Sequence, residues 1–298
     1  MLNYNTLRPI SSELGQLPRL LPPQKDINGE IQGKTFQYQP SDHPKYWLNG
    51  GNLQDYTEDE LLYTVNNYGF RGNDVTQLDT KPKLMTAGCS HTYGIGIRDH
   101  EVWGSKLAEQ LDMYHINIGV GGIGYDTVTL LVKQFFEQGI IPDTLVVLWP
   151  TVNRKLFVLN TTKSTNQSID DFIVNPSTQI TPNVYQYHIN NHPPEEEDIK
   201  MAIKGYLLQS VQQTLFDFWI YRELVISLCE HHNVKLIEGF LEDNTFNYVK
   251  EKCNRMIPRI FYNTWPDYAR DGLHFGPRSN LELAKHFDIC YQNQNDKI

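Results

Sequence analysis

The feature that most constrains the fold is a series of short apolar segments that alternate with amphipathic ones. Residues 144–149, TLVVLW, are almost continuously apolar, as expected for a strand that is covered on both faces. Further strands are predicted at residues 84–88, 115–119 and 234–240, and helices at residues 100–111, 126–137, 196–232 and 279–289, the last with Ser279 as its cap. Strands that alternate with helices predict a three-layer α/β/α sandwich with a flavodoxin-like parallel sheet. In such a sheet the ligand site lies beyond the carboxyl ends of the strands.

The rest of the chain is expected to divide into an extension, a main domain and an insertion. A chain of 298 residues can bury one large core, so a single domain with an appendage is expected. Residues 1–80 are rich in Pro, Gly, Asn, Gln and Tyr, and we predict an N-terminal extension packed on the main domain, with one short helix near residues 58–66. Residues 81–298 form the main domain. Within it, the Asn-, Thr- and Pro-rich residues 155–195 predict an insertion that acts as a lid or faces the substrate.

Charge and hydropathy restrict the partners of this chain. The formal net charge is −9 and Lys and Arg do not cluster, which argues against nucleic acid as a partner. No apolar window approaches the roughly 20 residues that span a bilayer, and the first residues lack the pattern of a secretory signal. We therefore expect a soluble, cytoplasmic protein without a membrane span, and packaging in a virus particle stays open. The four cysteines lack paired spacing, which favours free thiols in a reducing compartment. The oligomeric state stays open.

A serine directly follows the first predicted strand, in residues 88–94, GCSHTYG. A serine at a tight turn between strand and helix exposes its hydroxyl, and its own main-chain N–H can stabilise an oxyanion. Ser90 is therefore a candidate nucleophile. The alternative is that Ser90 only forms a glycine-flanked turn.

An acid and a histidine occur together near the C-terminus, in residues 271–277, DGLHFGP. An Asp three residues before a His, across a glycine turn, can place its carboxylate beside the imidazole. The carboxylate then fixes the tautomer and leaves the other ring nitrogen free to take a proton from a serine. Asp271 and His274 are therefore candidates for an acid–base pair. The alternative is an Asp-Gly turn followed by a partly exposed histidine.

Two loops offer hydrogen-bond donors for an oxyanion. Residues 117–122, NIGVGG, follow the second strand, and residues 151–154, TVNR, follow the third. The first loop can bring a main-chain N–H close to a ligand, and the second offers a side-chain amide. The alternatives are a glycine turn at a helix entry and a capping Asn.

The order Ser, Gly, Asn and then Asp-x-x-His resembles that of the SGNH (GDSL-like) hydrolases. The serine block is similar to the subgroup with GDSFTFGxGV, matched here by residues 88–97, GCSHTYGIGI. That subgroup often carries an upstream NxxGFRG, matched here by residues 67–72, NYGFRG. The resemblance covers about residues 66–153 and 265–290.

This resemblance implies a catalytic triad and an oxyanion hole without a metal or another cofactor. Ser90 would be the serine nucleophile, His274 the base, and Asp271 the residue that orients His274. The main-chain N–H groups of Ser90 and Gly122 and the side chain of Asn153 would form the oxyanion hole.

The chain departs from the family pattern at three positions. Cys89 stands where the family usually has Asp, Thr151 where it usually has Gly, and Arg154 where it usually has Asp. Arg154 adds a cation near the substrate, so we expect Arg154 and His91 to line the substrate site.

The sequence therefore predicts a serine esterase, or acylhydrolase, that acts through an acyl-serine intermediate on a small-molecule or carbohydrate ester, with acetyl as the favoured acyl group. Two alternatives use the same fold: an acyltransferase with the same triad, and an inactive binding or structural module.

Two other candidate sites are less favoured. Cys89 could itself be the nucleophile, but it has no dedicated base, so its thiol would mostly stay protonated. Residues 229–232, CEHH, suggest metal ligands, but no second ligand pair has suitable spacing, so a helix end with solvated histidines is favoured.

Overall fold

The protein is built around a parallel sheet. The computed structural model describes residues 35–36, 61–66, 68–74, 80–152, 154, 210–250 and 266–295. Four parallel strands, in the order β4-β3-β5-β6, form the main sheet of these described residues. Their bounds are Lys83–Gly88 for β3, Tyr114–Asn117 for β4, Thr144–Trp149 for β5 and Lys235–Phe240 for β6. The first of these strands along the chain lies between the second and the third, which is the flavodoxin-like order and confirms the predicted fold class.

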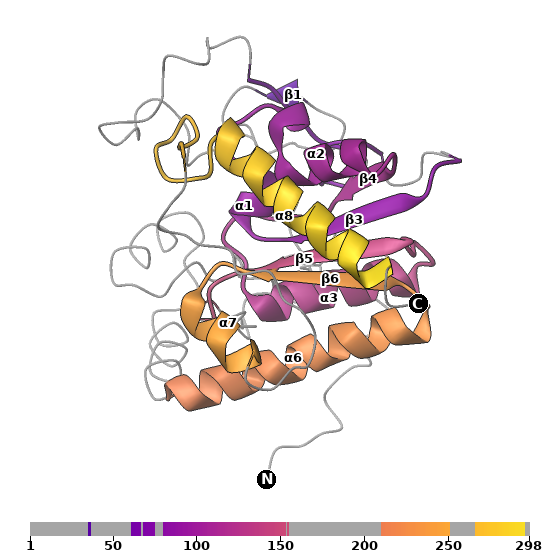
Figure 1. Cartoon of the computed structure of the whole chain (residues 1–298), viewed down its shortest axis with the longest axis vertical. Coiled ribbons are helices and arrows are strands. Elements are labelled where there is room, and N and C mark those ends of the chain that lie inside the picture. Colours follow the sequence, from indigo (N-terminus) through magenta and orange to yellow (C-terminus); the bar gives the residue numbers. More distant parts are fainter. Residues whose placement is uncertain are drawn as a thin grey trace, which may run out of the picture.

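Helices cover both faces of this sheet (Figure 1). Their bounds are Ser90–Tyr93 for α1, Trp103–Gln110 for α2, Tyr125–Glu137 for α3, Val211–His231 for α6, Asp243–Lys250 for α7 and Pro277–Asn295 for α8, with a 3-10 turn at Asp99–Glu101. Helix α2 packs against α8, and α3 packs against α6. Because the chain reverses direction across the sheet after β4, right-handed crossovers place α2 and α3 on opposite faces. The result is a three-layer α/β/α sandwich.

The core lies between these layers and includes one buried ion pair. Every residue of β5 is buried, in agreement with its continuous apolar sequence. Arg222 of α6 donates to Glu238 of β6 through Nε at 2.8 Å and Nη2 at 2.6 Å, and Trp149 Nε1 donates to the same carboxylate at 2.9 Å. A buried charge without a partner is strongly destabilising, so the two hydrogen bonds between Arg222 and Glu238 hold α6 on the sheet.

The described part of the predicted extension contains a strand where we expected a helix. Strand β2, Tyr63–Thr64, pairs with β1, Thr35–Phe36, in an antiparallel arrangement. Over residues 61–65 buried and exposed side chains alternate, which is the period of a strand and not that of a helix. The predicted helix near residues 58–66 is therefore wrong over its described part. Leu61 and Tyr63 are fully buried in the main core. The predicted insertion at residues 155–195 lies outside the described residues.

The last helix begins before the predicted cap. Helix α8 starts at Pro277, a residue favoured at the first helical position, so Ser279 lies inside the helix. The capping acceptor is the side chain of Asp267, which accepts from Arg278 N at 2.9 Å and from Ser279 N at 2.8 Å. The Ser279 hydroxyl lies 2.7 Å from the main-chain oxygen of Asp267. The prediction of Ser279 as the cap is wrong because a residue ten positions before the helix satisfies its free N–H groups.

Candidate active site

Ser90 lies at the carboxyl edge of the sheet, where β3 ends. It is the first residue of α1 and its exposed fraction is 6 %. Gly88 makes the turn possible, because a Cβ there would lie 2.2 Å from Thr92 Oγ1 and 2.7 Å from Leu148 O. Cys89 occupies the N-cap position and is fully buried in the core, so its thiol is not presented to a substrate.

Asp271 and His274 lie in a short hairpin. Tyr268 pairs with Phe275 in an antiparallel bridge, and Ala269 N donates to His274 O at 2.8 Å. Gly272 lies between the two arms with φ +71°, a conformation that favours glycine. The hairpin therefore explains the order Asp-Gly-x-His.

The side chains of Asp271 and His274 are hydrogen-bonded as predicted. His274 Nδ1 lies 2.5 Å from Asp271 Oδ2. Asp271 Oδ1 accepts from Leu273 N at 2.9 Å and from His274 N at 3.0 Å, so both carboxylate oxygens have partners. The exposed fraction is 1 % for the Asp271 side chain and 13 % for that of His274. With Nδ1 directed at the carboxylate, Nε2 is the ring nitrogen that can exchange a proton with another group.

The environment keeps Asp271 ionised. Burial by itself raises the pKa of a carboxyl, but the hydrogen bond and charge of His274 and the two main-chain N–H groups outweigh it. The pKa of Asp271 is therefore below its ordinary value. An ionised carboxylate is the form that stabilises a protonated imidazole.

His91 joins the serine segment to the hairpin. Its ring centroid lies 4.8 Å from that of His274 and 4.0 Å from that of Phe275. Because His91 directly follows Ser90 in α1, residues 90 and 274 belong to segments in contact. Burial, and then the electrostatic interactions with His274 and Arg154, hold the pKa of His91 well below its ordinary value, so its ring is neutral.

A second contact links the two segments behind the site. Gly96 O accepts from Arg270 N at 3.1 Å, directly beside Asp271. A Cβ at Gly96 would lie 2.9 Å from Ala269 Cβ, so the hairpin packs closely against the loop that follows α1. The loop that follows α1 and the hairpin are thus held together by a main-chain hydrogen bond and by close packing.

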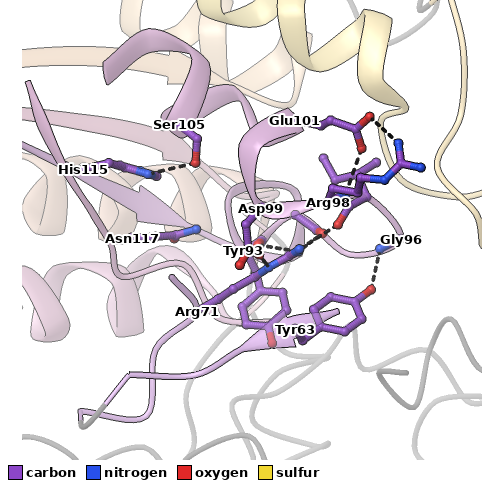
Figure 2. Close-up of polar contacts among 12 residues, drawn as sticks. Tyr63, Arg71, Tyr93, Gly96, Arg98, Asp99, Glu101, Ser105, His115 and Asn117 are labelled. Carbon is purple, nitrogen blue, oxygen red and sulfur yellow. Dashed lines mark hydrogen bonds and ion pairs between the residues drawn. The ribbon is translucent and has the colours of Figure 1, made fainter. Parts of the chain in front are cut away.

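Arg71 organises the loop that follows α1 (Figure 2). Its buried guanidinium donates to the main-chain oxygens of Gly94 and, at 2.6 Å, of Ile97, and it is paired with Asp99. It also lies over the ring of Tyr63, 4.4 Å from the centroid. The NYGFRG motif contains Arg71, but sequence reasoning gave it no role. Its only local signal is an arginine between an aromatic residue and a glycine, and its hydrogen-bond partners lie more than twenty residues away in the sequence.

The glycine loop after β4 touches both neighbouring loops. Gly119 N donates to Asn117 Oδ1 at 2.8 Å, and a Cβ at Gly119 would lie 2.5 Å from Tyr93 N in α1. A Cβ at Gly124 would lie 2.2 Å from Arg154 O, in the loop after β5. Gly122, the predicted oxyanion donor, belongs to this loop and has φ +79°. The other predicted donor, Asn153, lies outside the described residues.

Arg154 lies beside this glycine loop. Its main-chain N–H donates to Thr151 O at 3.3 Å, which closes a turn after β5. Its Nε and Nη1 are shielded from solvent, and neither donates to any residue that the structure describes. Arg154 thus stands near His91, where a residue lining the substrate site was predicted.

The described residues contain no site for a metal. Within them, no three His, Cys, Asp or Glu side chains come close enough to share an ion. Residues 229–232 lie at the end of α6, where Cys229 is buried and His231 is exposed. Over the same described parts of the chain, no helix has the length and hydropathy to cross a membrane.

Comparisons with known proteins give distant structural likenesses. No protein-family model matches the chain, and no curated protein matches it. Among solved structures, a lipolytic protein of the G-D-S-L family from Desulfitobacterium hafniense is 13 % identical over 70 % of this chain and 99 % of its own, with a TM-score of 0.31. A family 2 carbohydrate esterase with a carbohydrate-binding domain, from Corynascus thermopiles (Myceliophthora fergusii), is 11 % identical over 78 % of this chain and 71 % of its own, with a TM-score of 0.41.

A third likeness is to an acetyl xylan esterase from the rumen bacterium Butyrivibrio proteoclasticus. It is 16 % identical over 80 % of this chain and 66 % of its own, with a TM-score of 0.34. All three proteins bear the names of lipolytic proteins or esterases, the class that the motifs resemble. Because these TM-scores are low, the assignment of the three-layer α/β/α fold rests on the chain's own strand order and helix layers.

Proposed function

We propose that this protein is an SGNH-type serine esterase, a carboxylic ester hydrolase, with Ser90, His274 and Asp271 as its catalytic triad. The observation that carries the proposal is the Asp271–His274 pair, with Nδ1 and Oδ2 2.5 Å apart, packed against the residue that follows Ser90. A histidine oriented by a buried carboxylate and placed beside a serine is the arrangement that activates a hydroxyl.

The reaction begins when His274 Nε2 takes the proton of the Ser90 hydroxyl. The Ser90 oxygen then attacks the ester carbonyl and forms a tetrahedral oxyanion. As this intermediate collapses, the ester C–O bond breaks, His274 protonates the departing alcohol, and an acyl-serine remains. Water, deprotonated by His274, attacks the acyl-serine and releases the acid. Asp271 holds the imidazole in place and stabilises its protonated form.

The oxyanion is stabilised by groups at the carboxyl edge of the sheet. Ser90 is the first residue of α1, where a main-chain N–H has no partner within the helix. The Gly122 N–H and the Asn153 side chain complete the proposed oxyanion hole. Each such donor contributes on the order of 3 kcal/mol to transition-state stabilisation. No step of this mechanism uses a metal or another cofactor.

The proposed substrate is a small acyl ester, such as an acetyl group on a carbohydrate. The sequence supports a small acyl group because it contains no long apolar segment that would bind a lipid chain. Product analysis with and without a sugar acceptor separates hydrolysis from acyl transfer, the alternative that the same triad allows.

The test measures hydrolysis of p-nitrophenyl acetate and covalent labelling by a fluorophosphonate probe. We expect both in the wild type and neither in Ser90→Ala. The matched control is Ser105→Ala, because the Ser105 hydroxyl in α2 is hydrogen-bonded to a different histidine, His115, which has no part in the proposed mechanism. Ser105→Ala keeps both activities. Equal rates in the wild type and Ser90→Ala would refute the proposal, and a wild type that neither reacts nor is labelled would favour a binding module.

A further inference from the structure

The loop after β5 contains a cation whose hydrogen-bonding groups are unused. Arg154 Nε and Nη1 are buried, and neither has an acceptor among the described residues. The Thr151 hydroxyl in the same turn is also buried, and it has no partner within those parts of the chain. Buried donors of a charged group without acceptors cost more free energy than neutral ones, so this turn is incomplete by itself.

Two fully buried arginines, Arg71 and Arg222, differ from Arg154 in this respect. Arg222 donates twice to the Glu238 carboxylate, and Arg71 is bound by Asp99 and by main-chain oxygens. Both hold helices or loops in place. Arg154 makes no such contact with the described residues, so nothing there assigns it a structural role.

The position of Arg154 places it at the proposed active site. Strand β5, which precedes it, pairs with β3, which precedes Ser90, and Leu148 lies beside Gly88 in that pairing. Its main chain touches Gly124 at the end of the glycine loop. Its charge also acts on His91, since it helps to lower the pKa of that ring, and His91 contacts His274.

We propose that Arg154 binds a negatively charged group of the ester, so that the preferred substrate is an anionic ester. The inference rests on the proposed function and specifies its substrate class. A guanidinium pairs with carboxylate, sulfate or phosphate through two parallel hydrogen bonds, which supply the missing acceptors for Nε and Nη1. Because the whole chain has a net charge of −9, the attraction is local to this loop and not a property of the protein's overall field.

The anionic group belongs to the acyl part or to the alcohol part of the ester, and two pairs of substrates separate these sources. The acyl pair is mono-p-nitrophenyl glutarate and its neutral amide. The alcohol pair is 4-acetoxybenzoate and 4-acetoxybenzamide. In each pair a carboxylate is compared with an uncharged group of similar shape. The quantity measured is the ratio of kcat/KM for the anionic ester to that for the neutral ester.

We expect this ratio to fall by about 10-fold or more in Arg154→Gln, in at least one of the two pairs, because hydrogen bonds to a charged group are lost. Arg154→Lys keeps the charge but not the two parallel donors, so its ratio lies between those of the wild type and Arg154→Gln. The matched control is Lys133→Gln, which removes a charge from the exposed side of α3 and leaves the ratio unchanged. Dividing the ratio of each variant by the ratio of the wild type cancels differences in chemical reactivity between the esters.

A second measurement does not depend on turnover. Inhibition constants of 4-hydroxybenzoate and 4-hydroxybenzamide, or of glutaramate and the neutral diamide glutaramide, report binding of the same groups. We expect Arg154→Gln to weaken inhibition by the anion and not by the amide. Thermal unfolding of each variant checks that it is folded.

Two outcomes contradict different parts of the argument. In the first, the neutral esters are hydrolysed in a Ser90-dependent way, and the ratio of kcat/KM for the anionic to the neutral ester is the same in the wild type and Arg154→Gln for both pairs. That result would overturn the role of Arg154 and leave the proposed esterase activity intact. Failure of the wild type to hydrolyse any of the esters faster than Ser90→Ala would overturn the proposed function itself.

Discussion

His115 and His274, both among the residues that the structure describes, are hydrogen-bonded to side chains and differ in what surrounds them. His115, in β4, contacts Thr86 Oγ1 through Nε2 at 2.9 Å and Ser105 Oγ through Nδ1 at 3.1 Å (Figure 2 shows the contact with Ser105). His274 contacts the Asp271 carboxylate through Nδ1 and is partly exposed. Burial lowers the pKa of His115 to about 4, whereas the partner of His274 is negatively charged.

The difference shows that a serine hydroxyl beside a histidine ring is not by itself enough to make a catalytic pair. His115 has only neutral hydroxyl partners, and a ring with so low a pKa is a poor base near neutral pH. Its ring packs tightly, since a Cβ at Gly104 would lie 2.5 Å from His115 Nε2. His115 therefore joins β3, β4 and α2, and His274 is the histidine that we propose as the base.

Replacing each histidine in turn is the strongest test of this comparison. We expect His274→Gln to lower kcat/KM for p-nitrophenyl acetate by about 10⁵-fold, because the base is lost. His115→Gln lowers stability but leaves the rate per folded molecule unchanged. The measurement is steady-state kinetics with the folded fraction determined by circular dichroism. If the two variants lost the same activity per folded molecule, the comparison would fail.

The carboxylate is the next feature to test. In Asp271→Asn the imidazole loses its negative partner and the preferred tautomer, so we expect kcat to fall by about 10⁴-fold near neutral pH. Because the pKa of Asp271 is lowered by its contacts with His274 and the hairpin N–H groups, the wild-type carboxylate stays ionised as pH falls toward its ordinary pKa. The pH profile of kcat/KM checks this, and a variant as fast as the wild type would show that Asp271 does not orient the base.

His115 also predicts a pH dependence of stability. Its pKa is about 4 in the folded protein and 6.5 when unperturbed, so the unfolded chain binds a proton first as pH falls. This difference in pKa contributes about 3 kcal/mol to the free energy of unfolding. The contribution is fully present above pH 6.5 and is lost progressively as the pH falls from 6.5 to 4. Urea unfolding at several pH values should give a steeper loss for the wild type than for His115→Gln. Parallel curves would contradict the burial of a neutral His115.

The smallest effect concerns the hydroxyl beside His115. Ser105→Ala removes the partner of His115 Nδ1, and we expect a loss of about 1 kcal/mol in the free energy of unfolding. Ser227→Ala is the matched control, since Ser227 is an exposed serine in α6. Urea midpoints at pH 7.5 measure both changes, and equal midpoints would show that the Ser105 hydrogen bond adds nothing.

Local patterns in the sequence predicted much of the sheet and the contact between the side chains of Asp271 and His274. Strand β5 has the predicted bounds because it is covered on both faces and its sequence is apolar throughout. The Asp271–His274 hydrogen bond was predictable because the two residues are three positions apart and Gly272 turns the chain between them.

Contacts between distant residues could not be predicted in the same way. The hydrogen bond between Arg270 N and Gly96 O and the pairing of Arg71 with Asp99 depend on tertiary structure, and neither leaves a periodic signal in the sequence. Strand β2 was mistaken for a helix because a strand of two residues has too little alternation to compete with a helical pattern.

The hairpin that carries Asp271 and His274 is closed by its own residues. At one end the Asp267 side chain holds Arg278 N and Ser279 N, and Tyr268 pairs with Phe275 within it. Loops this short lose little chain entropy on closing, so the orientation of the imidazole is encoded almost entirely by adjacent sequence. A single inserted residue inside the hairpin would therefore separate its two arms and break the contact between the carboxylate and the imidazole.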